Sequence, residues 1–124
     1  MRNILVTGGA GYIGSHTVVE LISNGYEVLI VDSLYNSDIS VLDAIEKVSG
    51  VRVAFEKIDL RDKSALLALA SKYEITSVIH FAAFKAVKES KENPLKYYEN
   101  NILGLVNILY LMKECACKQL IFSS

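Results

Sequence analysis

Apolar residues gather in short runs of strand length, and between these runs the apolar positions follow the spacing of a helix. Five runs are either nearly uninterrupted or alternate with polar residues, which predicts strands over residues 3–7, 27–32, 51–58, 77–82 and 119–124. The intervening stretches predict helices over residues 12–24, 39–49, 63–73 and 94–115. Strand and helix therefore alternate along the whole chain.

Residues with the chemistry of helix ends stand at the borders of these stretches. Gly25 and Gly50 follow the first two predicted helices, and glycine is the usual residue where a helix stops. Asp62 is placed to cap the third helix. Asn93 and Pro94 open the fourth and longest one, as N-cap and first-turn proline. The borders support the same division into elements as the apolar pattern.

This alternation predicts the fold class. Strands that are apolar along nearly their whole length are buried on both faces, as in a parallel sheet covered by helices on either side. We therefore expect an α/β fold with a doubly wound parallel sheet of the Rossmann type, in the strand order 3-2-1-4-5. A single domain over residues 1–124 accounts for all the elements.

Composition and charge narrow the classes of partner. The 124 residues are 52% apolar, which suits one compact domain, and 13 basic against 14 acidic residues give a formal net charge of −1. Such a chain has no field that attracts nucleic acid or an anionic membrane. No apolar run has the length of a membrane span or the placing of a signal peptide. We expect a cytoplasmic protein, in which Cys115 and Cys117 have a structural role.

Four glycines lie between residues 8 and 14, in the stretch LVTGGAGYIGSH that joins the first strand to the first helix. Glycine allows a tight turn, lets the backbone approach a pyrophosphate, and lets the helix pack closely on the sheet. The amides and dipole of the helix N-terminus favour the phosphate charge. The loop therefore predicts a phosphate-binding turn at the carboxyl edge of the sheet.

The acidic residue that ends the second predicted strand extends this prediction. Asp32 stands eighteen residues after Gly14, where a dinucleotide-binding fold places an acid on the adenosine ribose. Its carboxylate is suited to accept both ribose hydroxyls and to repel a 2′-phosphate, which favours NAD over NADP. The alternative is an ordinary turn residue at a strand end, but strand, loop, helix and acid together indicate dinucleotide binding.

Four motifs suggest a family. TGGAGYIGSH, VIHFAAFKAVKES, NPLKYYENNILG and LIFSS occur in this order along the chain. Together they resemble the UDP-glucose 4-epimerase family of extended short-chain dehydrogenases/reductases, over residues 1–124. Members of that family invert C4 of a UDP-linked hexose in galactose metabolism, by taking a hydride onto tightly held NAD and returning it to the opposite face.

The resemblance also implies a set of cofactor-binding residues. The pyrophosphate would lie against Gly8, Gly11, Tyr12, Ile13 and Gly14, and the adenine ribose beside Asp32, Ser33, Asn36 and Ser37. Asp59 and Leu60 would border the adenine, while Phe81, Ala82, Ala83, Lys85 and Asn100 would line the rest of the cofactor. Three residues depart from the family pattern: Ser33 replaces a common asparagine, Ala83 a glycine, and Lys88 a small residue. His80 is interpreted as a hydrogen-bonded strand-end histidine without a chemical role.

The catalytic pair of that family is missing from the chain. The family's base is the tyrosine of a Tyr-x-x-x-Lys pair, and none of the seven tyrosines here has a lysine four positions later. We therefore assign no catalytic residue and expect an N-terminal part of an epimerase, inactive on its own. A nucleotide-sugar 4,6-dehydratase and a non-catalytic NAD-binding module stay open as alternatives.

The predicted helix over residues 94–115 carries apolar residues around most of its circumference. One sheet covers only one side of a helix, so this pattern requires a second apolar partner. We expect a homodimer formed through this helix, as the resemblance to dimeric epimerases also implies. In the complete protein the small-molecule partner would be a UDP-hexose.

Overall fold

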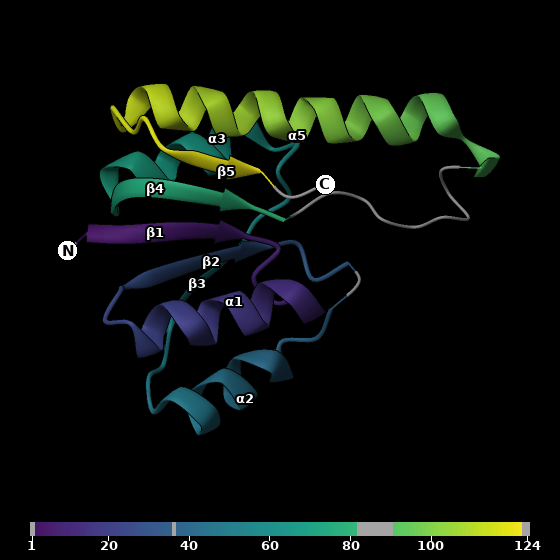
Figure 1. Ribbon diagram of the computed structural model, residues 1–124. Coiled ribbons are helices and arrows are strands. Elements are labelled where there is room, and N and C mark those ends of the chain that lie inside the picture. Colours follow the sequence, from purple (N-terminus) through teal and green to yellow (C-terminus); the bar gives the residue numbers. More distant parts are fainter. Residues whose placement is uncertain (1, 36, 82–90, 123–124) are drawn as a thin grey trace.

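A computed structural model of the chain describes residues 2–35, 37–81 and 91–122. Its strands are β1 (Arg2–Thr7), β2 (Val28–Asp32), β3 (Ala54–Lys57), β4 (Glu74–His80) and β5 (Leu120–Phe122). They form one sheet in the order β3-β2-β1-β4-β5, and every pairing is parallel (Figure 1). The predicted α/β fold, with a doubly wound parallel sheet in this strand order, is confirmed.

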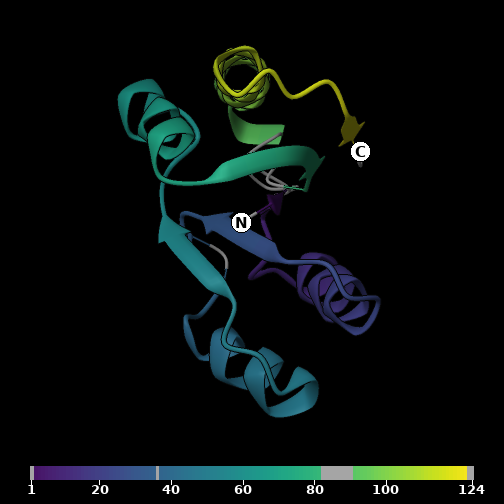
Figure 2. The ribbon, with the colours of Figure 1, turned by 90° about the vertical axis from the view of Figure 1, so that its left-hand side faces the viewer.

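Helices cover both faces of the sheet. They are α1 (Tyr12–Ser23), α2 (Ser40–Ser49), α3 (Lys63–Leu67), the 3₁₀ turn η1 (Ala68–Ser71) and α5 (Pro94–Glu114). Figure 2 shows α1 and α2 on one face and α3 and α5 on the other. In the described parts of the chain, no helix combines the length and the apolar character that crossing a membrane requires.

The register of the central strands divides their side chains between two cores. Leu5 of β1 lies opposite Leu29 of β2 and Val78 of β4, and all three belong to the core under α3 and α5. The next positions, Val6, Ile30 and Ile79, pair in the same way and pack under α1 and α2. Because successive strand residues point to opposite faces, uninterrupted apolar strands are what a sheet covered on both sides requires.

Most predicted helix ends hold, and the third helix differs. The Asp62 carboxylate accepts a hydrogen bond from the amide of Ala65, and Gly50 ends α2 with φ at 77°. The helix predicted over 63–73 instead changes to a 3₁₀ turn at Ala68, and β4 begins at residue 74 rather than 77. Side chains of Lys72 and Tyr73 bind Glu56 of β3, so tertiary contacts draw this segment out of the helix and into the sheet.

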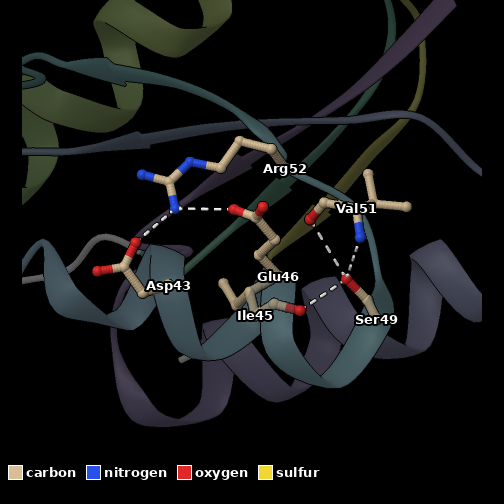
Figure 3. Close-up of polar contacts among 6 residues, drawn as sticks. All are labelled: Asp43, Ile45, Glu46, Ser49, Val51 and Arg52. Carbon is tan, nitrogen blue, oxygen red and sulfur yellow. Dashed lines mark hydrogen bonds and ion pairs between the residues drawn. The ribbon is translucent and has the colours of Figure 1, made fainter.

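A polar cluster shortens the predicted third strand and directs the chain into β3 (Figure 3). The Arg52 guanidinium lies 2.7 Å from Asp43 and 3.2 Å from Glu46, both on α2. The Ser49 hydroxyl donates to the carbonyl of Ile45 and accepts from the amide of Val51. These contacts hold residues 51–53 against the end of α2, so β3 begins only at Ala54. These ion pairs are exposed to solvent and contribute little to stability. They mark where the chain runs between α2 and β3.

Candidate functional site

A cavity of about 310 Å³ lies at the carboxyl edge of the sheet, where the loops after β1, β2 and β3 meet the first turn of α1 and one side of α5. Twelve predicted site residues line it: Gly8, Gly11, Tyr12, Ile13, Gly14, Asp32, Ser33, Ser37, Asp59, Leu60, Phe81 and Asn100. The other four, Asn36, Ala82, Ala83 and Lys85, lie outside the described residues. Parallel strands bring these distant segments together because all their carboxyl ends meet at one edge.

The glycine loop folds back tightly onto the start of α1. Gly8 has φ at 71°, and its carbonyl accepts a hydrogen bond from the amide of Gly11 at 3.0 Å. A β-carbon on Gly14 would collide with that same carbonyl, so only glycine fits there. The first turn of α1 contains no acidic residue, and α1 has no side-chain cap among the described residues. Its backbone amides and dipole are therefore suited to an anion in the cavity.

Asp32 joins the loops that follow β1 and β2. It is 9% exposed, and one carboxylate oxygen accepts from the amide of Ala10 at 3.1 Å. The other accepts from the amide of Leu34 at 2.8 Å and from the Ser37 hydroxyl at 3.3 Å. A carboxylate has roughly four acceptor positions, of which the described residues use three. One hydroxyl of a vicinal diol could donate to the fourth acceptor position. The other hydroxyl could replace the Ser37 hydroxyl, whose hydrogen bond to Asp32 is the longest of the three.

Residues 58–61, named here the 58–61 segment, follow β3 and form another wall of the cavity. Arg61 binds the Asp59 carboxylate through three nitrogens, with Nη2 at 2.6 Å, the main-chain amide at 2.9 Å and Nε at 3.0 Å. The Arg61 guanidinium thereby holds the pKa of Asp59 below its ordinary value, although partial burial opposes the shift. Asp59 is therefore a charged hydrogen-bond acceptor at neutral pH, and the hydrogen bonds from Arg61 fix the orientation of its carboxylate.

A buried hydrogen bond ties the carboxyl ends of β1 and β4 together. The Thr7 hydroxyl lies 2.6 Å from Nδ1 of His80, and its oxygen accepts from the amide of Phe81. Which of the two atoms donates in the contact with Nδ1 depends on the tautomer of the imidazole, because a hydroxyl oxygen can accept from more than one donor. Burial lowers the pKa of His80 to about 4. The interpretation of His80 as a hydrogen-bonded strand-end histidine agrees with this geometry.

The cavity contains residues that the sequence interpretation missed, among them Tyr35, Ile58, Arg61 and Gly104. Two of them carried a usable signal. Gly104 is an isolated glycine in a long apolar helix, which commonly marks a close approach of another segment. Arg61 stands two residues after Asp59, within reach for a local ion pair. Tyr35 and Ile58 have no distinctive pattern around them.

Comparison with known proteins supports a family assignment. The model of the family described as GDP-mannose 4,6 dehydratase matches residues 5–124. UDP-glucose 4-epimerase 2 of Arabidopsis thaliana is 48% identical over 126 aligned positions, covering 99% of this chain and 36% of the relative. The chain therefore spans about a third of the length of this curated relative.

Solved structures give the same result. A crystal structure of UDP-glucose-4-epimerase from Stenotrophomonas maltophila, with bound NAD and formylated UDP-arabinopyranose, superimposes with a TM-score of 0.93 at 47% identity, over 100% of this chain and 37% of that one. The enzyme from Bifidobacterium longum, in complex with NAD+ and UDP, also gives 0.93, at 41% identity over 98% of this chain and 36% of that one. The chain belongs to the GDP-mannose 4,6 dehydratase family and has the Rossmann-type fold of these UDP-glucose 4-epimerases.

Proposed function

We propose that this chain binds NAD and is the dinucleotide-binding part of a UDP-glucose 4-epimerase. The observation that carries the proposal is the joining of three features in one cavity: the glycine loop at the start of α1, Asp32 at the end of β2, and the 58–61 segment. The relatives at about half identity are epimerases, and two of the similar structures contain NAD. These similarities favour an epimerase over a 4,6-dehydratase.

The shape and chemistry of the cavity fit the parts of the dinucleotide. The cavity that Gly8 and Gly14 line offers room for a pyrophosphate at the positive end of α1. Asp32 would accept from the adenosine ribose, and Leu60 and Gly104 offer an apolar surface to the adenine. When bound, NAD supplies a reversible hydride acceptor.

The substrate and the proton transfers belong to the proposal for the whole protein. An epimerase must hold a UDP-hexose and remove a proton from its C4 hydroxyl, for which a Tyr-x-x-x-Lys pair would be needed. The 124-residue sequence contains no such pair. We propose that the 124-residue chain supplies cofactor binding and that the base is provided elsewhere in the complete protein, in the cytoplasm, where the free thiols of Cys115 and Cys117 remain reduced.

Cofactor titration tests this function. We expect the chain to bind NAD more tightly than NADP, because the Asp32 carboxylate would repel a 2′-phosphate. Asp32→Ala should weaken NAD binding by about 1–3 kcal/mol, the scale of lost charge-assisted hydrogen bonds. Glu27→Gln is the control, since Glu27 is an exposed acid outside the cavity. Isothermal titration calorimetry of the three proteins measures both affinities, and equal or tighter NADP binding by the unmodified chain would refute the proposal.

We also propose that a second copy of the protein covers the exposed side of α5. Seven large hydrophobic residues there are more than a third exposed: Leu95, Tyr98, Ile102, Leu103, Val106, Leu109 and Tyr110. The N-terminal half of α5 extends past the carboxyl ends of the strands (Figure 1), so the sheet of its own subunit does not cover that part. Self-association of matching apolar helices in a homodimer would bury these residues.

Light scattering tests this dimer. We expect the mass of a dimer for the unmodified chain and a shift towards the monomer for Ile102→Glu, because Ile102 is 61% exposed and a buried charge would oppose association. Lys47→Glu, at an exposed position of α2 on the opposite face of the sheet, is the control and should leave the mass unchanged. A monomer at high concentration for the unmodified chain would exclude the dimer.

A further inference from the structure

Asn107 is a polar residue on the apolar inner side of α5. It is 2% exposed, and its Nδ2 donates a hydrogen bond of 2.7 Å to the main-chain carbonyl of Leu60. Its neighbours Ile108 and Leu111 belong to the core on that face of the sheet. Since a buried amide is unfavourable without a partner, this bond gives Asn107 a defined attachment to the 58–61 segment.

Gly104 lies three residues earlier on the same side of α5 and contacts the same leucine. A β-carbon on Gly104 would lie 3.3 Å from Cβ of Leu60, closer than packed side chains normally approach. Glycine at this position therefore lets α5 come close enough for the Asn107 amide to reach the Leu60 carbonyl. The two α5 residues together set the distance between the helix and the 58–61 segment.

The other end of the 58–61 segment is attached to β2. The amide of Ile58 donates to the carbonyl of Asp32 at 3.2 Å. Asp59, which lies between the two attachments, has its carboxylate directed by Arg61. The position of the Asp59 carboxylate relative to Asp32 therefore depends on α5 as well as on the sheet.

We propose that Asn107 is a positioning residue for recognition of the adenine base, acting through the Leu60 carbonyl on the Asp59 carboxylate. This inference rests on the proposed binding of NAD. Adenine carries a 6-amino group, which donates hydrogen bonds, and a carboxylate only accepts them. A base with a 6-oxo group instead of the 6-amino group has no donor at this position. Its oxygen and the Asp59 carboxylate would then be two acceptors facing each other, which is unfavourable. A correctly placed Asp59 should therefore discriminate between the two bases.

The test compares NAD with nicotinamide hypoxanthine dinucleotide, which has the 6-oxo base, by titration calorimetry. The unmodified chain should prefer NAD by about tenfold, the factor expected for one hydrogen bond to a charged acceptor. Asn107→Leu, which lacks the amide donor, should reduce this preference to about threefold or less. The ratio of the two affinities is the readout, because a general loss of stability lowers both affinities without changing it.

Ile45→Val is the stability control. Ile45 is buried on α2, in the core on the opposite face of the sheet, and loss of a methyl group there should lower stability and keep the tenfold preference. If Asn107→Leu does not fold, Gly104→Ala is the second test of the inference. Its methyl group presses on Leu60, while alanine favours the helix. The preference for NAD should fall in the same way. If a folded variant keeps the preference for NAD, the role of Asn107 is wrong and the proposed NAD binding still stands. If the unmodified chain does not bind NAD, both the role of Asn107 and the proposed function are wrong.

Discussion

Gly14→Ala is expected to remove measurable NAD binding from the chain, with a loss of affinity of roughly a hundredfold or more. The added methyl group would collide with the main-chain carbonyl of Gly8, which is part of the loop itself and has no side-chain freedom with which to move away. Loop and helix must separate to relieve the contact. The amides that the proposal assigns to the pyrophosphate would then lose their common alignment.

Gly25→Ala controls for the general effect of replacing a glycine in this region. Gly25 follows the other end of α1 with φ at 86°, and among the described residues no atom lies within 4 Å of the added β-carbon. Its replacement should therefore cost about 1–2 kcal/mol of stability through backbone strain alone and leave NAD affinity intact. Calorimetric titration and urea unfolding of both variants separate the two effects. Wild-type affinity in a folded Gly14→Ala protein would contradict the proposed pyrophosphate site.

The free energy of unfolding is expected to fall by up to about 3 kcal/mol between pH 6.5 and pH 4 through His80 alone. In the folded chain burial lowers the pKa of this imidazole to about 4, and in the unfolded chain it returns to the ordinary value near 6.5. Well above pH 6.5 the ring is neutral in both states, so this group has no effect on stability there. As the pH falls towards 4, the unfolded state binds the proton and the folded state does not, which favours unfolding.

His80→Asn isolates this contribution. The side-chain amide of asparagine both donates and accepts, so it can replace Nδ1 as the hydrogen-bond partner of the Thr7 hydroxyl, and asparagine does not titrate. Urea unfolding at several pH values should show a shallower fall for His80→Asn than for the unmodified chain. His16→Asn, at the other histidine and on an exposed position of α1, should keep the original slope. Parallel curves for His80→Asn and the unmodified chain would contradict a neutral, buried His80.

Local sequence patterns determined the fold class, the strand order and the main features of the candidate site. Uninterrupted apolar strands between amphipathic segments specify a sheet buried on both faces, and the connection rules leave few ways to order its strands. The glycine loop and Asp32 were recognisable because their chemistry depends on their own backbone and on their place at the end of a strand. Residues after several strands were expected to meet because a parallel sheet gathers its carboxyl ends at one edge.

The tertiary structure decided the contacts between segments that are distant in sequence. Thr7 and His80 are 73 residues apart, and Leu60 and Asn107 are 47 apart. No local pattern pairs them, because each bond depends on how closely β4 or α5 packs against the rest of the fold. The early start of β4 and the break in the third helix have the same origin, since Glu74 and Ile75 pair with β1 and Tyr73 packs on the core, and these tertiary contacts override local helix propensity. Sequence periodicity specifies which face of an element is buried, whereas the partner of a buried polar group is set only when the elements pack.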